Sequence, residues 1–397
     1  MSLFLVLILV LVLHHYDAKP CVPKKLYSVL IVGQDYDSIN NYTAAVNASY
    51  NSITRDLYMP FGYMTYTALQ SPTGSLTGLK KPINYGSGIE WASGLVELYP
   101  NKNLQIGLYL VDSCDDIVNG KLNYEIDYLA NYIDDLALHN IHVYLRIGYE
   151  FDNPYNNYEP STYQKAFKHI VIRFRRMGIA NVAFVWHSYA QATKLSIDNW
   201  YPGDTYVDWC GVSIFEQPYA CTVPLKCIMP EVETVLKFCN DRNKPLMIAE
   251  STPFGGIVDE TDHNNQVNEA GYEGSTWSRW FVAVLALIEK YDIRMFSYIN
   301  CNWDALPMWQ QNHAVGVQWG DTRVEQYPDL FSRWKRQMLL SSRFFWDDGD
   351  KCMEEDAKVT DDAQFYYYYD DADIKPTNRS THPSYSLISF SLSLHSL

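Results

Sequence analysis

Basic residues are scarce in this chain of 397 residues. Lysine and arginine total 31 against 46 acidic residues, which gives a formal net charge of −15 and an isoelectric point near 5.0. Such a chain has no basic face that could displace counterions from phosphates, so nucleic acid is not an expected partner. No apolar run reaches the roughly 20 residues of a membrane-spanning helix, so no membrane span is expected.

Sequence signatures of several reaction classes are also missing. The chain has no Cys-x-x-Cys pair, no Gly-x-Ser-x-Gly elbow, no His-Glu-x-x-His helix and no Gly-rich phosphate loop. Their absence disfavours a redox or zinc module, a serine hydrolase of the α/β-hydrolase type, a zinc protease and a nucleotide-binding enzyme. We therefore expect a function that needs no metal and no other cofactor.

An apolar run, Leu3–Leu13, opens the chain and ends shortly before Ala18. Its length suits the centre of a secretory signal peptide, so we expect residues 1–18 to be a signal peptide and the protein to be secreted and extracellular. No Lys or Arg precedes the run, and Tyr16 is large for a cleavage site. An uncleaved anchor is therefore the alternative.

Cysteines and glycosylation acceptors agree with secretion. The chain has 8 cysteines, and disulfides are the usual state of cysteines in secreted proteins. Only Cys221 and Cys227 lie in one short loop, so they form the one local pair that the sequence indicates. Three Asn-x-Ser/Thr acceptors are expected to carry glycans, namely Asn41, Asn47 and Asn378.

Acidic residues concentrate near the C-terminus. Between Asp347 and Asp373 only Lys351 and Lys358 oppose the acids, and we expect residues 344–397 to form a solvated, disordered tail. The preceding residues, 19–343, are expected to form one domain. The segment Tyr385–Leu397 alternates Ser with apolar residues, which leaves a lipid-anchor signal as an alternative.

Short apolar runs recur along the body of the chain, and several are continuous, as in parallel strands covered on both faces. Helical spacing of apolar residues separates them, for example at Leu122–Leu136 and Tyr163–Met177. In the second helix, Ser161 with Gln164 indicates a capping box and Gly178 the helix end. The eight runs are Leu26–Gly33, Phe61–Thr67, Leu104–Val111, His142–Gly148, Val182–His187, Val207–Phe215, Leu246–Glu250 and Arg294–Asn300.

Eight strands alternating with helices predict an α/β fold of the (β/α)8 TIM barrel type. An open doubly wound sheet is the competing architecture. That fold usually carries a Gly-rich phosphate turn after its first strand, and the residues after Gly33 do not form one.

Glutamates stand at the ends of the fourth and seventh runs, where a TIM barrel carries its reactive groups. The carboxyl groups of Glu150 and Glu250 can therefore face each other across the barrel mouth. Two carboxyls about 5 to 5.5 Å apart suit a retaining glycosidase, in which one attacks the anomeric carbon and the other acts as acid and then base. The anionic nucleophile raises the pKa of its neighbour, and Arg146 is placed to keep the nucleophile ionised.

The most distinctive segments of the chain surround these glutamates. They are RIGYEFDNPYNNY at 146–158, NVAFVW at 181–186, WYPGD at 200–204, VDWCG at 207–211 and IAE at 248–250. Together they resemble glycoside hydrolase family 26, which contains β-mannanases and related β-glycanases. The resemblance covers roughly residues 25 to 340 and implies a (β/α)8 retaining glycosidase that cleaves a mannan- or glucan-type β-linked polysaccharide, endo-acting rather than exo-acting. It assigns the acid/base to Glu150, the nucleophile to Glu250 and the aromatic floor under the sugar to Trp303.

Two positions depart from the pattern of this family. Tyr149 stands where the family has His before the acid/base, and Phe215 stands where many members have a Tyr that hydrogen-bonds the nucleophile. Tyr219 is a candidate to replace that Tyr. The departures put mannan specificity in doubt and leave an alternative, a catalytically inactive barrel that binds polysaccharide or serves in an extracellular matrix.

Residues around the two glutamates are candidates for binding a polysaccharide substrate. They are Tyr66, Arg146, Tyr149, Asp152, Asn153, Tyr155, His187 and Trp303. Structural roles compete with binding at several of them: Arg146 forms a salt bridge with Glu150, His187 is a core or rim residue, and Asp152 and Asn153 cap a loop. The Trp200–Asp204 segment is expected to be a structural turn, and the protein is expected to be a monomer.

Overall fold

The computed structural model describes residues 19–49, 59–70, 75–191, 195–259, 267–310, 319–339, 343–345 and 352. The predicted signal peptide, the acceptor Asn378 and most of the predicted tail lie outside these residues. In the described part of the chain, no helix has both the length and the apolar character that crossing a membrane requires.

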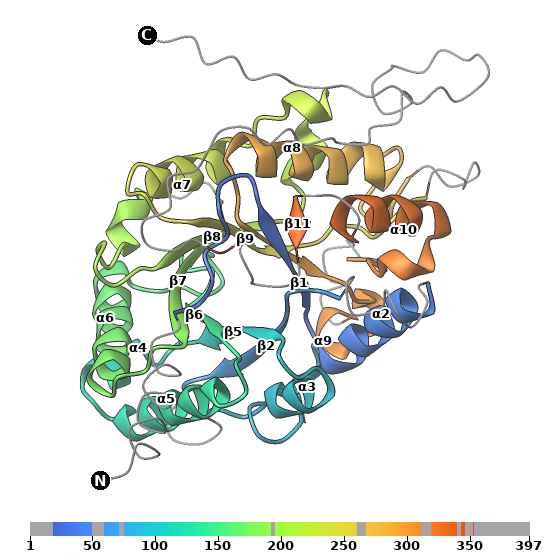
Figure 1. Ribbon diagram of the computed structural model, residues 1–397. Helices are drawn as coiled ribbons and strands as arrows, with labels where there is room; N and C mark the ends of the chain where they lie inside the picture. The colour runs from blue at the N-terminus through green and yellow to red at the C-terminus, as the bar shows by residue number, and fades with distance from the viewer. Residues whose placement is uncertain are drawn as a thin grey trace, which may run out of the picture.

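Eight parallel strands form a closed barrel, so the predicted (β/α)8 fold is confirmed (Figure 1). Neighbours follow the chain from β1 round to β10, and β10 closes the ring by pairing with β1 from Val29↔Met295 to Gly33↔Ile299. The barrel strands are β1 (Ser28–Gly33), β2 (Gly62–Ala68), β5 (Asn103–Tyr109), β6 (Val143–Ile147), β7 (Val182–Ser188), β8 (Trp209–Ile214), β9 (Leu246–Ser251) and β10 (Met295–Ile299).

Side chains along each strand alternate between two hydrophobic layers. On β1, Leu30 and Val32 belong to the large cluster between strands and helices, and Val29 and Ile31 belong to a smaller cluster that fills the barrel. Both layers are apolar, which is why the strands show continuous apolar runs rather than alternating ones. The barrel interior is therefore a packed core, and chemistry is confined to its open end.

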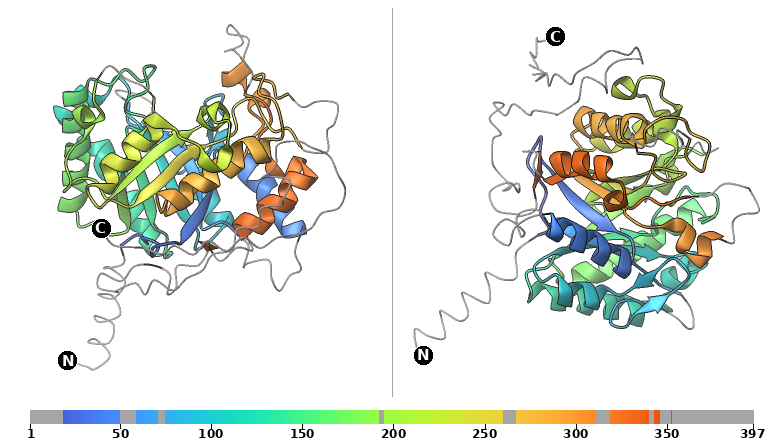
Figure 2. Two further views of the ribbon diagram at one scale, coloured as in Figure 1. Left: turned by 90° about the horizontal axis from the view of Figure 1, so that it is seen from above. Right: turned by 90° about the vertical axis from the view of Figure 1, so that its right-hand side faces the viewer.

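Helices surround the barrel as a ring in Figure 1, and the two side views of Figure 2 show them outside the strands. They are α2 (Tyr36–Ala48), α3 (Ala92–Leu98), α4 (Cys114–Val118), α5 (Asn123–Ala137), α6 (Pro160–Arg176), α7 (Pro230–Asn240), α8 (Val282–Lys290), α9 (Pro307–Gln310) and α10 (Pro328–Trp334). A π-helical turn, Trp277–Phe281, leads into α8, and a short 3-10 helix, Ile197–Trp200, lies between β7 and β8.

The start of α6 differs from the predicted capping box. Glu159 caps the helix by accepting hydrogen bonds from the backbone N–H groups of Ser161 and Thr162, and Pro160 occupies the first turn. Gln164 instead donates to the carbonyl of Asn199. Proline is favoured at the first helical position, which shifts the helix start ahead of the predicted box. Gly178 ends the helix as predicted, with φ of +79°.

The sequence did not predict two small sheet elements, because their strands are only two residues long. The hairpin β3 (Ile83–Asn84) and β4 (Ile89–Glu90) follows β2, and β11 (Phe344–Phe345) pairs with β1 beside the barrel seam. Cys352 is disulfide-bonded to Cys21. The described residues beyond 343 are therefore attached to the N-terminal end of the chain.

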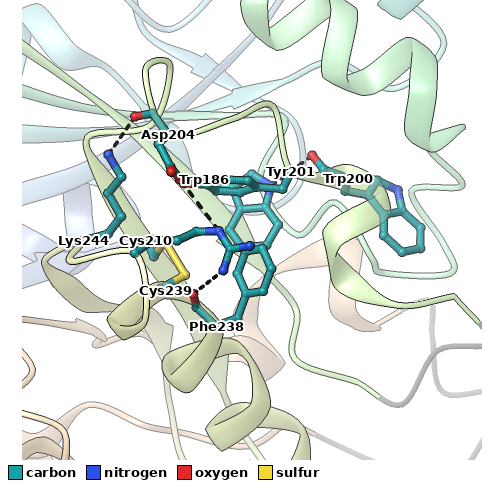
Figure 3. The surroundings of a disulfide bond; sticks show 9 residues. Trp186, Trp200, Tyr201, Asp204, Cys210, Phe238, Cys239 and Lys244 are labelled. Atoms are coloured by element: carbon teal, nitrogen blue, oxygen red, sulfur yellow. Dashed lines mark hydrogen bonds and ion pairs between the residues drawn. A yellow bond between two sulfur atoms is a disulfide. The ribbon is translucent and has the colours of Figure 1, made fainter.

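Three disulfides are present among the described residues: Cys21–Cys352, Cys210–Cys239 and Cys221–Cys227. The last is the local pair that the sequence indicates. Cys210–Cys239 joins β8 to α7, beside an aromatic group formed by Trp186, Tyr201 and Phe238 (Figure 3).

The Trp200–Asp204 segment folds over this disulfide as a structural turn. The backbone carbonyl of Asp204 accepts a hydrogen bond from Nζ of Lys244 at 2.7 Å (Figure 3). The Tyr201 hydroxyl donates to the Asp204 carboxylate at 2.8 Å. The indole N–H of Trp186 donates to the carbonyl of Trp200. These contacts hold the long β7–β8 connection against the barrel without an amphipathic helix.

Removal of the Cys210–Cys239 bond should cost much stability. The bond closes a loop with a sequence separation of 29 residues, so the double variant Cys210→Ala/Cys239→Ala is expected to lose about 3 to 4 kcal/mol of unfolding free energy. The Cys221–Cys227 bond closes a loop with a sequence separation of only 6 residues. The matched double variant Cys221→Ala/Cys227→Ala should therefore lose about 2 kcal/mol of unfolding free energy. Urea unfolding measures both, and an equal or smaller loss for the long loop would contradict the prediction.

Candidate active site

Glu150 and Glu250 lie at the carboxyl end of the barrel, and one residue of β8, Ser213, is a neighbour of both. The Ser213 hydroxyl donates to Oε1 of Glu150 at 2.7 Å, and Ser213 is the register partner of Glu250 on β9. Both carboxyl groups are largely buried, with 9% and 7% of their residue surfaces exposed. The structure therefore brings the two predicted glutamates to one site.

A β-bulge explains this arrangement. Val212 pairs with Ile248, so a regular ladder would pair Ser213 with Ala249, but the irregularity between Val212 and Ser213 shifts the partner to Glu250. A shift of one residue turns a side chain to the opposite face of a sheet. The bulge thus places the Ser213 hydroxyl on the same face as Glu250, and bulges of this kind are common beside active sites.

Arg146 holds Glu250 through a buried ion pair, formed between its Nη1 and Oε1 of the carboxylate. The guanidinium is fully buried and lies between two rings, with its Cζ 5.0 Å from the centre of Tyr66 and 5.2 Å from that of Tyr149. The ion pair therefore sets a cation directly against the predicted nucleophile and fixes the direction of its carboxyl group.

Gly107 on β5 makes the space for this arginine. A Cβ atom at position 107 would lie 2.6 Å from Cδ1 of Tyr66 and 2.9 Å from Nη2 of Arg146. Either contact is too close, so any side chain here would push the ring or the guanidinium away from its place. Glycine in a strand interior commonly marks such a close approach.

A chain of hydrogen bonds connects the two carboxylates below the site. Arg146 Nη1 lies 3.3 Å from Nδ1 of His187, and His187 Nε2 lies 3.0 Å from the Ser213 hydroxyl. Because arginine only donates, we assign His187 Nδ1 as the acceptor and Nε2 as the protonated nitrogen. Burial and the charge of Arg146 lower the pKa of His187 well below its usual value, so the ring is neutral.

Glu150 stands just beyond the end of β6 and is fixed on both oxygens. Its backbone has φ of +53°, so the turn after the strand, and not strand alternation, aims the side chain. Oε1 accepts from Ser213, and Oε2 accepts from Nδ2 of Asn153 at 3.1 Å. Burial, followed by the charge of Glu250, raises the pKa of Glu150 to about 8. A carboxyl with this pKa is protonated at neutral pH and can donate a proton.

The other predicted binding residues fall into different environments. Asp152 is buried, and its two oxygens accept from the Ser188 hydroxyl and the backbone N–H of Tyr189. His187 is fully buried between Arg146 and Ser213, whereas Tyr155 is 91% exposed. The geometry favours positioning roles for Asp152, Asn153 and His187, and contact with substrate stays a prediction for Tyr155.

Trp303 lies beneath a second tryptophan that sequence reasoning missed. Trp303 is 2% exposed, and Trp319 stacks on it with ring centres 4.8 Å apart. Trp319 is half-buried and also meets Phe215 edge-on at 5.3 Å. Trp319 comes after β10 in an irregular segment with no strand end or helical period to mark it, so no local signal separates it from other aromatic residues.

The two residues that depart from the family pattern, Tyr149 and Phe215, both pack against other aromatic residues of the site. Tyr149 lies against Arg146 and meets Tyr66 edge-on at 5.5 Å, so it forms part of the wall around the ion pair. The Phe215 ring packs on Trp319. The Tyr219 hydroxyl is 3.4 Å from Nδ2 of Asn268, and the ring stacks on Tyr272.

Among the residues that the structure describes, no group of three or more His, Cys, Asp or Glu side chains could hold a metal ion. A TIM barrel with one glutamate paired to a buried arginine and a second glutamate of raised pKa beyond another strand has the layout of a barrel that uses two carboxyl groups.

Comparison with known proteins supports the resemblance to this family. Residues 99–277 match the model of the family described as Glycosyl hydrolase family 26, which confirms the resemblance predicted from the sequence. The match covers somewhat less than half of the chain.

Curated relatives with similar sequences come from bacteria. The chain is 30% identical over 317 residues to a protein named beta-1,3-xylanase TXYA from a Vibrio species, covering 77% of this chain and 64% of that protein. It is 29% identical over 333 residues to a beta-1,3-xylanase from an Alcaligenes species, covering 81% and 65%. The chain thus spans less than two thirds of the length of these relatives.

Solved structures support the fold. The GH26 beta-mannanase BoMan26A from Bacteroides ovatus superposes with a TM-score of 0.54 at 13% identity, covering 84% of this chain and 95% of that one. A modular endo-beta-1,4-mannanase from Cellulomonas fimi gives a TM-score of 0.51 at 12% identity, with 87% and 78% covered. At such identities the likeness concerns the barrel alone.

Proposed function

We propose that this protein is a retaining glycoside hydrolase that cleaves a β-linked polysaccharide. In the first step the Glu250 carboxylate attacks the anomeric carbon, and Glu150 gives its proton to the departing glycosidic oxygen. In the second step Glu150 removes a proton from water, which attacks the anomeric carbon and releases Glu250. The observation that supports the proposal is the layout of two buried glutamates at one site, in which Arg146 binds Glu250 and Ser213 binds Glu150, whose pKa is raised.

The relatives suggest which polysaccharide to try first. Both curated relatives are named beta-1,3-xylanases, and they share 30% and 29% identity with this chain. The mannanases share its barrel at only 13% and 12% identity. We therefore propose a xylan backbone with β-1,3 links ahead of the mannan or glucan backbone expected from the sequence, and cleavage within the polymer.

Hydrolysis of a polysaccharide panel tests the proposal. The purified protein is incubated with β-1,3-xylan, β-1,4-xylan, β-mannan, β-1,3-glucan and β-1,4-glucan, and new reducing ends are counted. We expect release from β-1,3-xylan first, as a mixture of oligosaccharides. Binding to one of these polymers without release of reducing ends would favour the inactive, matrix-type barrel instead.

Secretion is part of the proposal. Disulfides in the described residues and the apolar run at Leu3–Leu13 support an extracellular setting, where a polymer too large to enter a cell is accessible. Expression with the native N-terminus, followed by N-terminal sequencing of the secreted protein, tests cleavage near Ala18.

The pH dependence follows from the pKa of Glu150. Burial and the charge of Glu250 raise this pKa to about 8 from its usual value near 4.5. The carboxyl group of Glu150 therefore carries the catalytic proton below that pH and loses it above that pH. We expect kcat/KM to fall tenfold per pH unit above about 8. A profile that stays flat to pH 10 would contradict the role of Glu150 as the acid.

Ser213 should influence the pH above which kcat/KM begins to fall. Its hydrogen bond to Glu150 lowers the pKa of that carboxyl against the larger effects that raise it. In Ser213→Ala the pKa of Glu150 therefore rises, and the descending limb should move to higher pH while kcat drops by about tenfold. Ser188→Ala, which removes a hydroxyl that bonds Asp152, is the control and should leave the limb unmoved.

A further inference from the structure

Gln105 is a polar residue in the packed interior of the barrel. It lies on β5 with 0% of its surface exposed, between Leu104 and Ile106, which belong to the cluster between strands and helices. Strand alternation therefore turns Gln105 inward, on the face of β5 that also carries Gly107 beside Arg146. A buried amide costs free energy unless it is hydrogen-bonded, so its partners show what keeps it there.

The amide group of Gln105 joins β5 to the strand of Glu250. β5 is the third strand of the ring and β9 the seventh, so the two lie on opposite sides of the barrel (Figure 1). Nε2 donates to the backbone carbonyl of Ala249 at 2.7 Å, and Oε1 accepts from the Ser297 hydroxyl at 2.7 Å. Because a carbonyl only accepts, the first contact fixes the orientation of the amide. Gln105 therefore spans the interior to reach the residue directly before Glu250.

The β-bulge explains why this contact matters. Among the described residues, the register between β8 and β9 passes from Ile248 to Glu250 and gives Ala249 no partner on β8. The register between β9 and β10 covers Met247 and Ile248. The backbone just before the proposed nucleophile thus lies outside both registers, and the side chain of Gln105 supplies a hydrogen bond to it.

The residue after Glu250 is held by the same network. The Ser251 hydroxyl donates to the carbonyl of Ser297 at 2.7 Å, and both serines are fully buried. Ser297 thus contacts Gln105 through its hydroxyl and Ser251 through its carbonyl. Glu250 therefore has a fixed neighbour on each side along β9, and its carboxyl group is left to pair with Arg146.

We propose that Gln105 is a positioning residue for the nucleophile. By holding the backbone at Ala249, it sets where the Glu250 carboxyl group meets Arg146 and the anomeric carbon. This inference rests on the proposed function, because it assumes that Glu250 attacks a sugar. A displacement of about 1 Å at a reacting group can cost on the order of 10²-fold in rate. Loss of the Gln105 contact should therefore slow the attack and not the binding of substrate.

The rate of attack by Glu250 can be measured with a 2-deoxy-2-fluoro glycosyl fluoride of the sugar that the panel identifies. In Gln105→Met we expect the rate of labelling and kcat each to fall about tenfold, because methionine has a similar length but cannot donate to Ala249. KM should stay near the wild-type value, since the variant residue lies below the site. Ser297→Ala removes the donor to Gln105 and should give a smaller loss in the same direction.

Asn181 provides the matched control for stability. It is a buried amide that donates to the carbonyls of Ile133 and Ile141, and it lies at the amino end of β7, away from the site. Asn181→Leu should lower the melting temperature without slowing the labelling. An unchanged labelling rate in Gln105→Met would overturn the inference. Equal slowing in Asn181→Leu would also overturn it, because the loss would then follow general destabilisation.

A double-mutant cycle in urea separates this inference from the proposed function. The unfolding midpoints of wild type, Gln105→Met, Glu250→Gln and the double variant are compared. If Gln105 positions Glu250 on Arg146, the change Glu250→Gln should lower the midpoint less in Gln105→Met than in wild type. Additive shifts would contradict the positioning role. A wild type that cleaves no polymer and takes no label would overturn the proposed function, and the cycle would still decide the role of Gln105.

Discussion

Substitution of Glu250 by alanine is expected to lower kcat by about 10⁴-fold or more, because Glu250 is the proposed nucleophile that forms the glycosyl-enzyme intermediate. Azide should then restore part of the activity. The shortened side chain leaves space above Arg146, whose charge attracts a small anion, and the anion can attack the anomeric carbon from the side that Glu250 occupied. The product of this attack is a glycosyl azide of inverted configuration.

Stability must be separated from catalysis in this variant. Alanine leaves the buried guanidinium of Arg146 without its carboxylate, which costs about 3 to 5 kcal/mol. Glu250→Gln keeps an oxygen that can accept from Arg146 and is the matched control: it should be as inactive as Glu250→Ala but unfold closer to the wild type. Near-normal turnover in the folded Glu250→Gln variant would remove Glu250 from the mechanism.

Replacement of Glu150 by glutamine should lower kcat/KM on polysaccharide by about 10² to 10⁴-fold, the range typical of lost general acid catalysis. Glutamine can still accept from Ser213, so the site is expected to keep its shape. An aryl glycoside whose leaving phenol is acidic needs no proton to depart. The first step on such a substrate should be nearly as fast in Glu150→Gln as in wild type.

This contrast between substrates identifies the role of Glu150. In Glu150→Gln the glycosyl-enzyme should accumulate, because no base activates water, and a burst of released phenol should precede slow turnover. The fall of the rate above pH 8 should also disappear. An equal loss on both kinds of substrate would show that Glu150 has another role, such as holding the substrate.

The barrel was predictable because every strand is covered on both faces. Two apolar layers produce continuous apolar runs, and the predicted run at Val182–His187 differs from β7 (Val182–Ser188) by one residue. The ends of these runs then located Glu150 and Glu250. The alternative prediction of a salt bridge between Arg146 and Glu150 is wrong, because Arg146 pairs with Glu250 across the site.

The parts that the sequence could not reveal depend on register and distant contacts. Ser213, which binds Glu150, is the register partner of Glu250 only because a bulge shifts β8 by one residue against β9, and no composition signal marks that shift. The positive φ of Glu150 is set by the turn after β6, so strand alternation could not foresee its direction. Trp319 and Trp303 stack although neither lies on a barrel strand, so no strand pattern could pair them.

Trapping of the intermediate tests the central claim most directly. A 2-deoxy-2-fluoro glycosyl fluoride of the sugar that the panel identifies slows both steps but keeps a reactive leaving group, so the glycosyl-enzyme accumulates. After digestion with a protease, mass spectrometry locates the labelled residue. The account predicts a single label on the peptide that contains Glu250. A label on another residue, or turnover with inversion and no label at all, would contradict it.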